Sequence, residues 1–554
     1  MACAQERSPA DLVIMGGKIY TADSLRPEAE AVAVRDERIV CVGTNEEVGA
    51  WLGDATEVID LEGKTMTPGF IESHGHLLGV GYNAMQLNLM AVKSYDELVA
   101  RVAEAVANAK PGEWIIGRGW HQDKWTSRPT RIVKGFQTHH ALSAVSPENP
   151  VFLYHASGHA ALANAKAMEI AGVNPLSVER MQNGLDASGG EIIRDKEGNP
   201  TGIFNERAMG LVARHIPART TETDSTALVL AQETCLRYGI TSFHDAGVPQ
   251  STIDLYTAFR KTDQLKLRLY VMLGGPELAR DWFAKGPQID PEHFLTIRAI
   301  KLSCDGALGS RGAWLLEPYS DRPDFHGMAT LPMDTVLAIA RSALQHGFQV
   351  CSHAIGDRAN REVLDKYEKA FNTYPEFAKD HRFRIEHAQH LHPDDIPRFA
   401  SLGVIPAMQA IHMSSDRPWA IERLGKKRIV EGAYVWQSLL RSGARIANGT
   451  DAPVEPVNPL PSFFASITRQ TLEGKPEGGY EPQERMTREQ ALRSYTLDAA
   501  YAAFMEEVTG SIEEGKLADF VVLSRDIMTI PAAEILETEV EMTIVGGTIR
   551  YRKK

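Results

Sequence analysis

Six side chains able to bind metal ions stand at the ends of separate apolar segments of this 554-residue chain: His74, His76, Lys301, His353, His387 and Asp451. One residue separates the first two at the end of a predicted strand. Because side chains alternate along a strand, both imidazoles point to the same side and can bind one cation. Neutral imidazole suits zinc or a similar divalent ion. The set predicts a two-metal hydrolytic centre.

Each later histidine also has a simpler interpretation. His353 and His387 could each be a core histidine that hydrogen-bonds to the backbone, which is the common fate of a lone buried imidazole. Two successive strands that both end in histidine, together with His74 and His76, favour metal binding instead.

Lys301 stands between Ile300 and Leu302, so the sequence predicts a buried amine beside the cations. Burial and nearby positive charge disfavour the ammonium form. A neutral amine can react with carbon dioxide, and the resulting carbamate has two oxygens that can bridge two metal ions. The alternative is a lysine that reaches solvent or pairs with Asp305.

Asp451 follows an apolar segment that ends in Asn448-Gly-Thr. A carboxylate there can bind a metal ion, accept a proton from the attacking water and pass it to the leaving nitrogen. Taken alone, Asp451 could equally be a helix N-cap ahead of Ala452. As the last member of the ordered set, it is interpreted as both metal ligand and catalytic residue.

The elements that position these residues alternate between strand and helix. After the strand ending at His74, apolar segments predict strands at 239–244, 266–272, 297–302, 348–353, 383–387, 404–408 and 445–448. Helical spacing of apolar residues predicts helices at 333–346 and 358–371. Eight such units predict an α/β fold with a (β/α)₈ TIM barrel, whose reactive groups gather at the carboxyl ends of the strands.

Two further parts complete the predicted organisation. Short strands near both termini predict one small β-sandwich from residues 1–66 plus 508–554, beside a metal-dependent barrel over 67–507. About 160 residues separate the first and second barrel strands, which is far more than an ordinary connection. We therefore expect a large insertion, residues 77–234, to act as a lid.

The bulk properties exclude several classes of function. A net charge of −13 and a pI near 5.8 oppose a general role on nucleic acid or anionic membranes. No apolar run approaches the roughly 20 residues of a membrane span, and the five cysteines lack any CxxC pair. We expect a cytoplasmic protein with reduced thiols that acts on small molecules. The alternative is a periplasmic or exported protein, if residues 1–9 are the remnant of a removed signal.

The chain resembles the amidohydrolase superfamily, in the branch of enzymes similar to N-substituted formamide deformylase. The resemblance covers nearly the whole chain, through segments 11–19, 68–76, 301–312, 385–389, 449–451 and 510–519. It implies a barrel with a small β-sandwich, two divalent metal ions and hydrolysis by water. The resemblance implies that His74, His76 and Asp451 bind the more buried ion. It implies likewise that His353 and His387 bind the more exposed ion and that carboxylated Lys301 (N6-carboxylysine) bridges the two ions.

Related ring deaminases carry a glutamate three residues after the histidine of the fifth strand. Gly356 occupies that position here, which lowers support for a deaminase. Residues that could bind substrate or polarise its carbonyl are His159, Trp120, Arg311, His412 and Asn448. His159 ranks first because its surroundings resemble a recurrent stretch of this branch. Each of the five could also serve only in loop packing.

The sequence thus predicts a binuclear zinc amidohydrolase that cleaves an amide- or formamide-type carbon–nitrogen bond through a metal-bridging hydroxide. Alternatives on the same centre are an ester or lactone hydrolase, a deaminase or an isomerase. A non-catalytic barrel scaffold is a further alternative. A homodimer is the expected oligomeric state.

Overall fold

The structure, a computed structural model, describes residues 8–122, 125–155, 160–175 and 190–554. The chain divides into two compact units. One consists of Met1–Leu77 together with Gln232–Lys554, and the other of Leu78–Ala231. Every candidate metal ligand belongs to the first unit.

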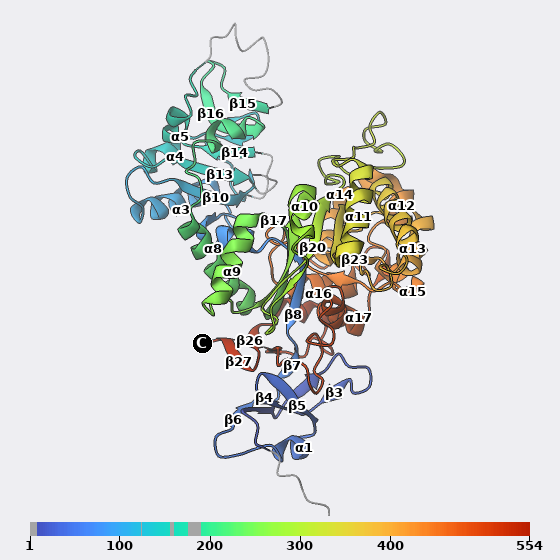
Figure 1. The fold of residues 1–554 in the computed structure, drawn as a ribbon. Helices are drawn as coiled ribbons and strands as arrows, with labels where there is room; N and C mark the ends of the chain where they lie inside the picture. The colour runs from blue at the N-terminus through green and yellow to red at the C-terminus, as the bar shows by residue number, and fades with distance from the viewer. Residues whose placement is uncertain (1–7, 123–124, 156–159, 176–189) are drawn as a thin grey trace, which may run out of the picture. The chain divides into compact units, whose positions relative to one another are not determined.

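The centre of the first unit is a nearly closed barrel of eight parallel strands (Figure 1). In chain order these are β8 (Phe70–Gly75), β17 (Ile240–Val248), β18 (Arg268–Gly274), β20 (Leu295–Ser303), β21 (Gln349–Ala354), β22 (Arg384–His387), β23 (Ile405–Met408) and β24 (Ala447–Asn448). Each pairs with its sequence neighbour, as a TIM barrel requires. The short β19 (Gln288–Ile289) is added antiparallel to β20.

The two outermost strands, β8 and β24, are joined by hydrogen bonds near their carboxyl ends. The Ser73 hydroxyl donates to the Asn448 carbonyl at 2.7 Å, and the Asp451 amide donates to the His74 carbonyl at 2.8 Å. The first and last candidate ligands therefore lie at the same seam, which is the line where β8 and β24 meet.

The barrel strands are buried on both faces, which explains their continuous apolar sequences. Each lies where the sequence predicts a strand, although β17 continues beyond the predicted end to Val248. Gly247, at φ +78°, allows the shift in register within that extension.

Helices follow most of the strands. They are α8 (Thr221–Arg237), α9 (Gln250–Lys261), α10 (Gly275–Phe283), α11 (Met333–His346), α12 (Asp357–Thr373), α13 (Ile396–Leu402), α14 (Ala410–Gly432), α15 (Trp436–Ser442), α16 (Pro459–Thr468), α17 (Arg488–Ser494) and α18 (Leu497–Tyr501). The helix predicted at 333–346 is α11, which follows Pro332 and ends at Gly347 in the left-handed conformation. No described helix is both long and apolar enough to cross a membrane.

Strands from both ends of the chain pair in one six-stranded sheet. Its order is β27 (Thr548–Arg552), β26 (Val540–Val545), β25 (Phe520–Leu523), β7 (Thr65–Pro68), β2 (Lys18–Tyr20) and β3 (Glu28–Ala29). A four-stranded sheet contains β5 (Arg38–Gly43), β4 (Ala31–Arg35), β1 (Leu12–Met15) and β6 (Glu57–Asp60), with α1 (Asn45–Gly49) beside it. Buried side chains of both sheets form one hydrophobic cluster. Asp519, just before β25, holds the buried Arg268 of β18 through two hydrogen bonds of 2.8 and 3.0 Å.

The second unit has its own sheet and cores. Its strands, in sheet order, are β15 (Gly190–Arg194), β16 (Pro200–Glu206), β14 (Ala160–Ala163), β13 (Val151–His155), β10 (Ile115–Trp120) and β9 (Leu87–Asn88). A two-stranded sheet pairs β11 (Ile132–Val133) with β12 (Phe136–Gln137). The helices are α2 (Leu77–Met85), α3 (Tyr95–Ala107), α4 (His140–Val145), α5 (Ala165–Ile170) and α7 (Met209–Ala213).

Candidate metal centre

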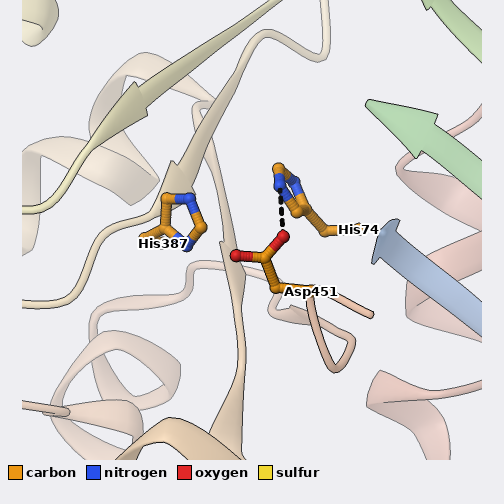
Figure 2. A group of neighbouring side chains, drawn as sticks. All are labelled: His74, His387 and Asp451. Carbon is orange, nitrogen blue, oxygen red and sulfur yellow. Dashed lines mark ion pairs between the residues drawn. The ribbon is translucent and has the colours of Figure 1, made fainter. Parts of the chain in front are cut away.

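Three of the candidate ligands converge at the carboxyl end of the barrel. One potential ligand atom from each of His74, His387 and Asp451 lies within 4.8 Å of those of the other two. Figure 2 shows the three side chains turned toward one another, with Asp451 paired to His74. They come from the first strand, the sixth strand and the loop after the eighth, so only a closed barrel brings them together.

The other three candidates surround this group. The Lys301 Nζ lies 3.2 Å from the His74 Nε2, and the His76 Nε2 lies 3.2 Å from the Asp451 Oδ1. The His353 ring packs edge-on against the His387 ring, with 4.5 Å between their centroids. The structure thus places all six predicted metal ligands at one end of the barrel.

The backbone at two of these positions adopts a conformation that side chains other than glycine rarely take. Asp451 has φ +57° and His387 has φ +74°. Such strain persists only where the surroundings enforce it, and it concentrates at functional sites. The Asp451 backbone amide is held by the His74 carbonyl, and the His387 Nδ1 lies 2.7 Å from the Gln409 Oε1. Both residues are therefore fixed in place.

A fully buried ion pair between Arg384 and Glu386 holds the ring of His74. Arg384 binds Glu386 through hydrogen bonds of 2.7 and 2.8 Å, and Glu386 in turn hydrogen-bonds to the His74 Nδ1. Burial opposes ionisation of Glu386, but the Arg384 guanidinium and His74 outweigh it and lower the pKa of Glu386. A carboxylate on Nδ1 leaves the Nε2 lone pair free to face a metal ion.

A second buried carboxyl group ties the Asp451 loop to the first strand. Glu72 accepts hydrogen bonds from the Thr450 amide at 2.8 Å, the Thr450 hydroxyl at 2.7 Å and the His74 amide at 3.1 Å. Burial raises the pKa of Glu72 to about 8. This carboxyl group positions the backbone of His74 and that of Thr450, which precedes Asp451, without being a candidate ligand itself.

At His74 and His387 the electrostatics of the centre fit a cation held by neutral imidazoles. Burial, with help from Lys301, lowers the pKa of His74 to about 4. Burial and the neighbouring His353 lower the pKa of His387. Burial likewise lowers the pKa of Lys301. For Asp451, burial is outweighed by the imidazoles around it, beginning with His76, and its pKa falls well below the usual range. Two neutral imidazoles and one carboxylate suit a divalent ion such as zinc.

Of the predicted substrate contacts that the structure describes, His412 packs against a candidate ligand of this centre. It stands in the first turn of α14, and its buried ring is stacked 6.2 Å from the ring of His387. Its Nε2 is buried and has no hydrogen-bond partner in the part of the chain that is described. An imidazole with an unused ring nitrogen is available to a ligand.

Two of the other predicted contacts already have their polar groups satisfied. The Asn448 side chain accepts from the Ala410 amide at 3.1 Å and donates to the hydroxyl of Ser466 at 3.2 Å. It therefore joins β24 to the start of α14. Arg311 makes two hydrogen bonds of 3.1 and 2.8 Å to Asp321.

The remaining two predicted contacts belong to the second unit. Trp120 is fully buried in a core cluster there and donates its indole N–H to the Leu153 carbonyl at 2.8 Å. These contacts give it a packing role within that unit. His159 lies outside the described residues.

Sequence reasoning missed the residues that hold the candidate ligands, namely Glu72, Arg384, Glu386 and Gln409. The sequence does contain a signal for Glu72, Arg384 and Glu386. Glu72 shares a strand face with His74, and Arg384 shares one with Glu386 within an otherwise apolar strand. Charged residues inside a buried strand require partners, so the sequence pattern indicates a structural role for each of these residues.

The chain matches the amidohydrolase family over residues 57–551. It belongs to this family. The resemblance seen in the sequence is thereby confirmed. An amidohydrolase-family relative, N-substituted formamide deformylase of Arthrobacter pascens, is 28% identical, and the match covers 98% of both chains. Protein LONG AFTER FAR-RED 3 of Arabidopsis thaliana is 35% identical, over 98% of this chain and 92% of its own.

A solved structure extends the comparison to the fold. An uncharacterized metal-dependent hydrolase from Pyrococcus furiosus superposes with a TM-score of 0.74 and 29% sequence identity, covering 94% of this chain and 100% of that one. Together with the convergence of His74, His387 and Asp451, membership in the amidohydrolase family supports a metal-dependent hydrolase.

Proposed function

We propose that this protein hydrolyses the carbon–nitrogen bond of a small amide- or formamide-type substrate with the help of bound divalent metal ions. The observation that carries the proposal is the convergence of His74, His387 and Asp451 beside the Lys301 amine. This group lies at the barrel end where TIM-barrel enzymes carry out their reactions.

We further propose two ions, with zinc as the metal that best fits the donors. Their ligands would be His74, His76, Lys301, His353, His387 and Asp451. Lys301 would bind as N6-carboxylysine. Its buried amine has a lowered pKa, and a neutral amine can add carbon dioxide to form a carbamate with release of a proton. The carbamate supplies the two oxygens that a pair of ions needs.

The reaction assigns a distinct task to each group. When bound, the metal ions lower the pKa of a water molecule and polarise the scissile carbonyl. The Asp451 carboxylate takes a proton from the attacking water and returns it to the nitrogen as the carbon–nitrogen bond breaks. Glu386 keeps the His74 Nδ1 occupied. The His412 Nε2, which has no partner among the described residues, would donate to the carbonyl oxygen as negative charge develops there.

Two observations favour an amide-type bond over ring deamination. The relative named N-substituted formamide deformylase matches over 98% of both chains. At the position where ring deaminases carry a glutamate, a Cβ on Gly356 would lie 2.1 Å from the Trp314 carbonyl oxygen. Only glycine fits there, so a glutamate shuttle is sterically excluded from this backbone.

The proposal is tested with protein purified without chelators. Metal content is measured, and formamides, N-acyl amino acids and aryl amides are assayed beside esters of matched shape, with and without added zinc. We expect turnover of an amide or formamide that a chelator abolishes and zinc restores. Turnover of esters alone, or metal-free protein indifferent to chelators, would contradict the proposal.

A further inference from the structure

Asp305 is a fully buried acid two residues beyond β20, the strand that contains Lys301. The sequence allowed an ion pair between these two residues. In the structure the Lys301 Nζ lies 3.2 Å from the His74 Nε2. The Asp305 Oδ1 lies 3.4 Å from the His353 Nε2. Asp305 therefore lies against a candidate metal ligand without being one itself.

Three backbone amides hold the Asp305 carboxylate in place. The Ile355 amide donates to Oδ1 at 3.0 Å. The amides of Gly356 and Trp314 each donate to Oδ2 at 2.9 Å. Ile355 and Gly356 directly follow β21, whose last residue but one is His353. The carboxylate is thus fixed relative to the strand end that carries this histidine.

The ring of His353 contacts both Asp305 and the candidate metal centre. It packs edge-on against the His387 ring, with 4.5 Å between the centroids. Its Nε2, on the side of Asp305, is buried and meets no described residue in full hydrogen-bond geometry. A carboxylate oxygen attracts an N–H group and repels a nitrogen lone pair, so Asp305 favours the neutral ring whose proton is on Nε2. The lone pair that a metal ion requires is then on Nδ1.

A comparable arrangement occurs at His74. There Glu386 hydrogen-bonds to Nδ1 and leaves Nε2 to face a metal ion. Metal-binding histidines usually donate their second ring N–H to a carboxylate, a backbone carbonyl or water, which fixes the orientation of the ring. Glu386 and Asp305 would thus serve histidines of the two different proposed ions.

We propose that Asp305 is a positioning residue that turns the Nδ1 of His353 toward the more exposed ion. The inference rests on the proposed function, because it concerns the second of the two proposed ions. Asp305 would act through His353 alone and would bind neither ion. Its removal should therefore affect the binding of one ion and spare the other.

The first test uses metal-free wild-type protein, so it does not depend on the folding of any Asp305 variant. Nuclear magnetic resonance of protein with isotope-labelled histidine shows which ring nitrogen carries the proton at about pH 8.5, above the ordinary pKa of histidine. The signals of His353 are identified by their absence from His353→Ala. We expect the proton on Nε2, and a proton on Nδ1 would overturn the proposal.

The second test measures zinc binding by competition with a chromophoric chelator. His353→Ala identifies the binding step that depends on this ring. Asp305→Asn should weaken the same step by about 10- to 100-fold and change the other step less than about two-fold. Asp357→Asn is the matched control and should weaken neither step. The buried Asp357 accepts from the amides of Leu316 and Arg358, both at 2.9 Å, and so joins the loop after β20 to the start of α12.

Three results of the zinc titration would overturn the role of Asp305. They are unchanged binding in Asp305→Asn, loss of the other step alone, and equal weakening in Asp305→Asn and Asp357→Asn. If the wild type binds no second ion but Asp305→Asn shifts the His353 proton away from Nε2, the two-ion part of the proposed function fails. The hold of Asp305 on His353 then stands.

Discussion

Replacing Glu386 with glutamine should separate its two roles, which are to balance the buried charge of Arg384 and to hold the ring of His74. In the folded protein Glu386 and Arg384 are both fully buried, and their two hydrogen bonds measure 2.7 and 2.8 Å. Removing one charge of such a pair leaves the other buried and uncompensated, which costs about 3–5 kcal/mol of stability. Glu386 also hydrogen-bonds to the His74 Nδ1. Loss of a carboxylate behind a metal-binding histidine weakens metal affinity by about 10- to 100-fold.

Asp519→Asn is the matched control for this experiment. Asp519 holds the buried Arg268 through two hydrogen bonds of 2.8 and 3.0 Å. Arg268 is the first residue of β18, at the strand end opposite to that of the ligands. This variant should lose comparable stability and keep the metal affinity of the wild type. Denaturant unfolding of chelator-treated protein gives the stability difference, and competition with a chromophoric chelator gives the metal affinity.

The pH dependence of stability provides a further check on Glu386. The Arg384 guanidinium and His74 lower its pKa against the effect of burial. Its stabilisation is thus fully present above the pKa of an unfolded glutamate, about 4.3, and is lost as pH falls toward the folded pKa. Below about pH 4, Glu386→Gln should lose less additional stability than the wild type. If Glu386→Gln and Asp519→Asn weaken metal binding equally, or Glu386→Gln leaves it unchanged, the assigned support of His74 is wrong.

Two further substitutions test the centre, and a third tests the close packing of Gly356. Asp451→Asn should lower turnover by about 10²- to 10⁴-fold while retaining much of the bound metal, measured by steady-state kinetics and elemental analysis; full activity would contradict the role of Asp451. Lys301→Ala should lose metal and partly recover activity with short carboxylic acids, and two tightly held ions in that variant would refute the carbamate. Gly356→Ala places its Cβ 2.1 Å from the Trp314 carbonyl oxygen and should cost at least about 1–3 kcal/mol in denaturant unfolding, whereas Gly49→Ala, with open space around it, should cost nothing measurable.

The strands that carry the ligands were predictable because barrel strands have a simple local signature. A short apolar run buried on both faces ends where a polar ligand begins, as at His353 in β21 and at His387 in β22. The ligand order along the chain then follows the strand order. Local sequence therefore contains most of the information needed to place these side chains at one end of the barrel.

The interactions that hold the ligands were not predictable in the same way, because they join distant parts of the chain. Glu386 meets His74 across 312 residues and Thr450 meets Glu72 across 378. Sequence also cannot show that the hydrogen-bonding groups of a polar side chain are already paired within the protein. Asn448 was therefore expected to contact substrate, although its amide joins β24 to α14.

The geometry of the centre depends on closure of the barrel more than on any one strand. Asp451 has a strained backbone, φ +57°. Its amide is held by the His74 carbonyl, and the preceding Thr450 is held by Glu72, both from β8. The first strand thus supplies candidate ligands to the site and also fixes the last candidate ligand. A substitution that loosens this seam should disturb the proposed metal ions and the proposed acid–base residue together.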